Sequence, residues 1–145
     1  MPLASARQAV AQSGARLRIL ALDDELSIRT FLKKVLAKDG MDCDPFQGGA
    51  EALEGLRDTT YDVMLIDHRM AGMNGTEFYD AAIELRPELT KRAVFMSGDV
   101  LNAELARFAT SHGIRLLSMP FDIDAVIRVV RETVSAAEAD EHQDR

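Results

Sequence analysis

Four polar residues of this sequence stand where apolar runs end, and their types suit metal and phosphoryl chemistry. They are Asp23, Asp24, Asp67 and Ser97. If the runs are neighbouring parallel strands, their carboxyl ends meet at one edge of a sheet, and the four side chains lie close together. The sequence therefore predicts a polar patch with three carboxylates and one hydroxyl.

Three carboxylates that close together cannot all be ionised cheaply without a cation. Oxygen ligands with room for water suit Mg²⁺, which binds one or two carboxylates and keeps several waters. A carboxylate can also act as a nucleophile toward phosphorus and form an acyl phosphate, while a metal screens the incoming charge. These residue types indicate an acidic Mg²⁺ pocket with a hydroxyl nearby.

Each of these residues also has a purely structural interpretation. Asp24 or Glu25 can cap the helix that follows. Asp67 can form a turn before its Gly-containing loop, and Ser97 can be an ordinary loop residue before Gly98. The functional interpretation rests on finding all four polar groups at the ends of three apolar runs.

Apolar runs alternate with segments of helical periodicity. The strands are expected at residues 18–22, 41–46, 62–66, 92–96 and 114–118, and the helices at about 28–36, 50–56, 76–85, 101–109 and 123–134. Fully apolar strands are typical of a parallel sheet with helices on both faces, and Pro45 favours an edge position for the second strand. The pattern predicts an α/β, flavodoxin-like doubly wound (βα)5 fold with a five-stranded parallel sheet of order 2-1-3-4-5.

The composition excludes several classes of protein. The chain has 145 residues, 47% of them hydrophobic, and a net charge of −7 from 17 Lys and Arg against 24 Asp and Glu. The acidic balance argues against nucleic acid as a partner. No apolar run approaches the roughly 20 residues of a membrane span. The single cysteine, Cys43, excludes an intramolecular disulfide and suits a reducing, cytoplasmic location.

We expect one domain at residues 17–136, between two polar ends. Residues 1–16 contain arginine but no acid, and we expect a flexible N-terminal extension there. Residues 137–145 carry several acids and almost nothing apolar, which predicts an acidic disordered tail.

Four motifs occur in order at the expected strand ends. They are Leu22-Asp-Asp-Glu25, Asp67-His-Arg-Met-Ala-Gly-Met-Asn-Gly75, Phe95-Met-Ser-Gly98 and Ser118-Met-Pro-Phe121. In type, order and spacing they resemble the receiver domain of bacterial two-component response regulators. The resemblance extends from about Leu17 to Val134, and although each motif alone is weak, the four together are specific.

The resemblance implies a role for each matching residue. Asp67 corresponds to the phosphoacceptor, which receives its phosphoryl group from a histidine kinase or a histidine phosphotransfer protein. Asp23 and Asp24 correspond to the acidic pair that binds Mg²⁺ together with Asp67 and the backbone carbonyl of Arg69. Ser97 corresponds to the hydroxyl that hydrogen bonds to the new phosphoryl group and drives the switch.

Further positions of the family pattern modulate this chemistry. Gly98 corresponds to the residue that leaves space beside the phosphoryl group. Arg69 and Asp99 occupy positions that, in the family, tune the hydrolysis of the acyl phosphate.

The sequence departs from the family pattern at three positions. Met119 stands where the family has a lysine that pairs with the phosphoryl group, and methionine offers neither charge nor donor. Leu116 replaces the aromatic residue of the switch, and Ala71 replaces a loop proline. The sequence therefore predicts that the residues needed for phosphorylation are present. The residues that would transmit phosphorylation to the rest of the domain are partly missing.

Three functions are open at this point. The first is a phosphoryl-accepting receiver of a two-component phosphorelay that signals by protein–protein contact, either alone or as part of a hybrid kinase. The second is a pseudo-receiver, an interaction module not regulated by phosphorylation, which the loss of the lysine favours. The third is a metal-dependent phosphohydrolase, but Arg69 stands where its general acid would be needed, and we do not expect an enzyme.

Overall fold

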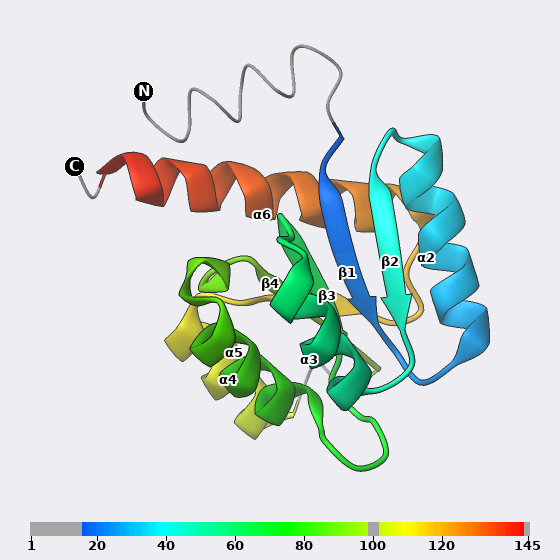
Figure 1. The fold of residues 1–145 in the computed structure, drawn as a ribbon, viewed down its shortest axis with the longest axis horizontal. Helices are drawn as coiled ribbons and strands as arrows, with labels where there is room; N and C mark the ends of the chain where they lie inside the picture. The colour runs from blue at the N-terminus through cyan, green and yellow to red at the C-terminus, as the bar shows by residue number, and fades with distance from the viewer. Residues whose placement is uncertain (1–15, 99–101, 144–145) are drawn as a thin grey trace.

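The computed structural model describes residues 16–98 and 102–143. Its strands form one parallel sheet of order β2-β1-β3-β4-β5 (Figure 1), as the sequence predicts. The strands are β1 (Arg18–Leu22), β2 (Asp42–Phe46), β3 (Val63–Asp67), β4 (Ala93–Ser97) and β5 (Arg115–Ser118). The connecting helices are α2 (Leu26–Lys38), α3 (Gly49–Asp58), α4 (Gly75–Leu85), α5 (Ala103–His112) and α6 (Ile123–Gln143), with the short 3-10 helix η1 (Pro87–Leu89) before β4.

Helices cover both faces of the sheet, which explains why the central strands are apolar throughout. On one face, Ile19 and Ala21 of β1 pack with α2 and α6. On the other face, Leu20 and Leu22 pack with α3, α4 and α5. Among the residues that the structure describes, no helix has the length and apolar character needed to cross a membrane.

The strand register brings the carboxyl ends of three strands together. Leu22 at the end of β1 pairs with Ile66 of β3, one residue before Asp67. Asp67 pairs with Met96 of β4, one residue before Ser97. The edge position of β2, which carries Pro45, agrees with the prediction from that proline.

The prediction of a disordered tail from residue 137 is wrong as far as the structure describes it. Helix α6 continues to Gln143, and Ala137 within it is buried. Two of the acidic residues have partners near the start of β4, since Asp140 binds Lys91 and Glu141 binds Arg92, each at 2.8 Å. Composition along the chain does not reveal such partners, because they come from a distant segment.

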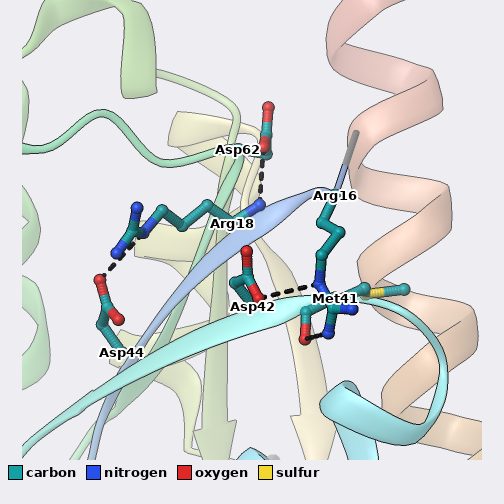
Figure 2. A network of polar contacts seen from close by, with 6 residues as sticks. All are labelled: Arg16, Arg18, Met41, Asp42, Asp44 and Asp62. Carbon is teal, nitrogen blue, oxygen red and sulfur yellow. Dashed lines mark hydrogen bonds and ion pairs between the residues drawn. The ribbon is translucent and has the colours of Figure 1, made fainter. Parts of the chain in front are cut away.

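A network of charged residues links β1, β2 and the residue before β3 (Figure 2). It lies toward the amino ends of these strands, whereas Asp23, Asp24 and Asp67 lie at their carboxyl ends. The Nε atom of Arg16 lies 2.9 Å from Asp42, and that of Arg18 lies 3.1 Å from Asp44. The backbone N–H of Arg18 donates to Asp62 at 2.8 Å. Arg16, predicted to belong to the extension, therefore contacts the domain, while residues 1–15 lie outside the described part.

Candidate functional site

Asp23, Asp24 and Asp67 meet at the carboxyl edge of the sheet, between β1 and β3. One oxygen of each carboxylate lies within 4.8 Å of the other two. Asp23 is 1% exposed, Asp67 is half-buried and Asp24 is exposed. The cluster therefore opens to solvent on one side, as a site for a partly hydrated cation requires.

Burial and repulsion from neighbouring charges disfavour ionisation of Asp23 and Asp67. Burial, and to a smaller extent the neighbouring charge of Asp23, raise the pKa of Asp67 to about 7. Burial also raises the pKa of Asp23, with a smaller contribution from Asp24. Because like charges at this distance disfavour ionisation, a hard divalent cation would relieve the repulsion. The oxygen-only donor set fits Mg²⁺.

Asp23 is held by hydrogen bonds on several sides. Its backbone N–H donates to the carbonyl of Phe46 at 3.1 Å, and its Oδ1 accepts from the N–H of Glu25 at 2.8 Å. Nη1 of Arg29 donates to the Asp23 carbonyl at 2.9 Å. Sequence reasoning missed Arg29, because an arginine in the first turns of a helix is too common to attract notice. These contacts fix Asp23 without neutralising its carboxylate through an ion pair.

The loop between β3 and α4 folds back tightly on the end of β3. The backbone N–H of Arg69 donates to Oδ1 of Asp67 at 3.3 Å, and that of Gly75 donates to the carbonyl of His68 at 3.0 Å. A Cβ atom on Gly75 would stand 2.7 Å from the Asp67 carbonyl oxygen. Gly75 is thus required for this close approach, and sequence reasoning named it only as the end of a motif.

Helix α4 begins with a capping box, which the sequence analysis also missed. Oδ1 of Asn74 accepts from the N–H of Glu77 at 2.9 Å, and Oε1 of Glu77 accepts from the N–H of Asn74 at 3.0 Å. An Asn followed three residues later by Glu is the signal that identifies such a cap. The reciprocal bonds fix the end of the loop that begins at Asp67.

A pocket of about 380 Å³ adjoins the cluster and is lined by Asp67, Arg69, Ser97 and Gly98. Ser97 is only 4% exposed, and among the described residues, the chain neighbours aside, no atom lies within 4 Å of where a Cβ of Gly98 would stand. The pocket therefore has room for a small group beside Asp67. Asp99, predicted to modulate hydrolysis, lies outside the described residues.

Met119 contributes no polar side chain to this pocket. Its backbone N–H donates to the carbonyl of Ser97 at 2.9 Å, and its side chain packs partly buried against the apolar cluster beneath α2 and α6. Leu116 packs against the cluster on the opposite face of the sheet. Among the described residues that line the pocket, Arg69 is the one cation.

The sequence matches the response regulator receiver domain family over residues 19–131. It is 34% identical over 117 residues to the DNA-binding transcriptional regulator NtrC of Escherichia coli K12, a match that covers 81% of this chain and 24% of that protein. The chain thus spans about a quarter of the length of this larger relative. It is 30% identical to the response regulator receiver protein CpdR of Brucella abortus, covering 83% of this chain and 98% of the relative.

Solved structures share the fold. The chemotaxis protein CheY4 of Vibrio cholerae superposes with a TM-score of 0.76 at 23% identity, covering 82% of this chain and 99% of that one. The receiver domain of the sensor histidine kinase PA1611 of Pseudomonas aeruginosa gives a TM-score of 0.73 at 17% identity, covering 83% and 99%. The family match and the fold agree with the aspartate cluster at the carboxyl edge, and the chain belongs to the response regulator receiver domain family of two-component signalling.

Proposed function

We propose that the chain accepts a phosphoryl group on Asp67 as the receiver of a cytoplasmic two-component phosphorelay. The donor is a histidine kinase or a histidine phosphotransfer protein, and the signal passes on by protein–protein contact. The observation that carries the proposal is the cluster of three carboxylates within 4.8 Å, which opens on a pocket containing Ser97.

The transfer is a displacement at phosphorus. A carboxylate oxygen of Asp67 forms a bond to the phosphorus atom, the phosphorus–nitrogen bond of the phosphohistidine breaks, and the imidazole keeps the electron pair and takes up a proton. The hydroxyl of Ser97 donates to a phosphoryl oxygen, and Gly98 leaves room beside it.

Mg²⁺ fits this site, where Asp23, Asp24, Asp67 and the backbone carbonyl of Arg69 would hold it. When bound, it neutralises the negative charge that gathers around the transferred group. The receiver domain of PA1611 is described with a magnesium ion coordinated in its active site cleft, which supports the assignment by analogy.

An intact-protein mass spectrum after incubation with acetyl phosphate tests this function. We expect a gain of one phosphoryl group that needs Mg²⁺ and is lost in Asp67→Asn. Asp80→Asn, an exposed aspartate of α4, is the matched control and should be phosphorylated like the wild type. A folded protein that gains no phosphoryl group with Mg²⁺ present would disprove the proposal.

That negative result would favour the alternative, a pseudo-receiver that binds its partner without phosphate. The observation behind this alternative is Met119, whose side chain packs against the apolar cluster and supplies no charge to the pocket. The two functions differ in one measurable respect, since only the first makes partner binding depend on Asp67.

A further inference from the structure

The peptide unit between Asp23 and Asp24 joins two members of the acidic cluster. Its carbonyl oxygen belongs to Asp23, and Nη1 of Arg29 donates to that oxygen at 2.9 Å. Because the peptide unit is planar and the two side chains leave the backbone on either side of it, its orientation sets where the two carboxylates point relative to each other. The contact with Arg29 therefore acts on the geometry of the cluster.

Asp23 and Asp24 depend on the backbone to different degrees. Asp23 is 1% exposed, its Oδ1 accepts from the N–H of Glu25 at 2.8 Å, and its own N–H donates to the carbonyl of Phe46 at 3.1 Å. Asp24 is exposed, so the orientation of its backbone decides the direction of its carboxylate more than packing does. The contact with Arg29 thus matters most for placing Asp24 relative to Asp23.

The place of Arg29 in α2 suits it to hold this peptide unit. It lies one turn into the helix, where its backbone N–H donates to the carbonyl of Glu25 at 3.2 Å. Side chains of a helix tilt toward its amino end, and the half-buried side chain of Arg29 reaches back to the loop that precedes α2. A hydrogen bond from a charged donor is stronger than one from a neutral donor. The contact thereby links α2 to the loop that carries both aspartates.

A cation beside a metal site has two opposing effects. Its charge repels a divalent cation, which weakens binding, but partial exposure of Arg29 screens this repulsion. Its hydrogen bond orients the ligands before the cation arrives, and the loss of such an outer contact typically weakens metal binding about 10-fold or more. Because Nη1 donates to the carbonyl of Asp23, this contact leaves the carboxylate oxygens to the cation. The orienting effect should therefore outweigh the repulsion.

We propose that Arg29 is a positioning residue for the divalent-cation site and orients the peptide between Asp23 and Asp24 so that both carboxylates face one ion. This inference rests on the proposed function, which assigns Mg²⁺ to the cluster. It requires no contact between Arg29 and the cation. An event that displaces the first turn of α2 would then change the affinity of the site for Mg²⁺.

Three readouts on the full chain test the proposal. The first is the dissociation constant for Mg²⁺, from a titration with magnesium chloride followed by backbone amide NMR. The second is the hydrogen exchange of the Asp24 and Glu25 amides without metal. The third is the rate of phosphorylation by acetyl phosphate against Mg²⁺ concentration. The variants are Arg29→Met, which lacks charge and donors, and Arg29→Lys, which keeps one charged donor, with Lys34→Met, an exposed cation of the same helix, as the matched control.

We expect Arg29→Met to weaken Mg²⁺ binding about 10-fold and to speed the exchange of both amides, because the peptide unit loses its orienting partner. Phosphorylation should need about 10-fold more Mg²⁺ while its rate at saturating Mg²⁺ changes little, as expected of a residue that acts through the ligands alone. Arg29→Lys should recover part of the affinity, and Lys34→Met should bind Mg²⁺ like the wild type.

Two results would overturn the inference. An Arg29→Met variant that binds Mg²⁺ as tightly as the wild type, or more tightly, would show that the contact does not orient the ligands. An equal loss of affinity in Lys34→Met would reveal a general effect of charge. Arg29→Gln, which has a shorter, uncharged side chain, replaces Arg29→Met if that variant does not fold. If the wild type binds Mg²⁺ but is not phosphorylated, the proposed function fails and the affinities still decide the inference, whereas a wild type that binds no Mg²⁺ overturns both.

Discussion

Asp67 combines two properties that oppose each other at neutral pH. For the proposed phosphoryl transfer it must be ionised to attack phosphorus, yet burial and the charge of Asp23 raise its pKa to about 7. Without a cation, a large part of the population carries a proton on this carboxyl at pH 7. A divalent cation bound at the cluster would lower the pKa again, so that under the proposed function metal binding would also favour the ionised form of Asp67.

The raised pKa of Asp67 predicts how stability depends on pH in the absence of metal. Between the unfolded value of 3.8 and about 7, the folded chain holds a proton that the unfolded chain releases, so this group makes stability fall as pH rises. The contribution is roughly 1–2 kcal/mol, since partial exposure screens the charge. Urea unfolding in EDTA at pH 5 and pH 8 measures it.

In that experiment Asp67→Asn should gain stability over the wild type at pH 8 and much less at pH 5. Asp80→Asn serves as the control for adding an amide elsewhere, and it should show no such difference between the two pH values. An equal effect of Asp67→Asn at both pH values would contradict the prediction.

The sequence predicts the members of the acidic cluster but not their electrostatics. Asp23, Asp24 and Asp67 were found because acids that end apolar runs are conspicuous. The pKa of Asp67 depends on burial and on the distance to Asp23, neither of which can be read along the chain. The contact of Arg29 could not be predicted from the sequence either, because its partner is the backbone carbonyl of Asp23.

At the scale of elements, the junction between β3 and α4 positions Asp67. The first residue of α4, Gly75, packs against the last residue of β3 so closely that a side chain does not fit. The capping box of Asn74 and Glu77 then fixes the direction in which the helix leaves. The geometry of Asp67 therefore depends on residues that carry no chemistry themselves.

Gly75→Ala tests this dependence. The added Cβ would stand 2.7 Å from the Asp67 carbonyl and 3.0 Å from the His68 Cα, so the backbone must shift. We expect a loss of about 1–3 kcal/mol in stability and weaker Mg²⁺ binding, measured by urea unfolding and by calorimetric titration.

The matched control is Gly48→Ala, where the new Cβ would make only an ordinary contact of 3.7 Å with Glu51. It should leave Mg²⁺ binding unchanged. A Gly75→Ala variant that binds Mg²⁺ like the wild type would show that the junction does not position Asp67.

Most elements were predictable because their signals are local. Apolar runs identified the strands, and the edge position of β2 followed from Pro45. The end of α6 was not predictable in this way, because Asp140 and Glu141 look like a solvated tail until Lys91 and Arg92 appear beside them.

At the scale of the whole molecule, the two edges of the sheet carry different charge arrangements. At the carboxyl ends of the strands lie acids that repel one another. At the amino ends lie ion pairs, one of which contains Arg92. This arginine is 2% exposed and binds Glu141 of α6 and the carbonyl of Asp62. The last turns of α6 thereby anchor to the start of β4.

Glu141→Ala should remove this anchor and lower stability by roughly 1–2 kcal/mol, because it leaves a buried guanidinium short of its partner. Asp140→Ala removes the neighbouring pair with Lys91, in which both side chains are about half exposed, and should cost less than about 1 kcal/mol. Thermal unfolding of both variants measures the difference, and equal losses would refute the distinction.

The order of the strands also has a consequence for folding. Asp23 and Asp67 belong to strands that are neighbours in the sheet but are separated along the chain by α2, β2 and α3. The cluster is therefore incomplete until the central parallel pair has closed, which is a slow, non-local step. A refolding chain should thus acquire any affinity for a divalent cation late and in a single step. The onset of cation binding during refolding would then report when β1 and β3 pair.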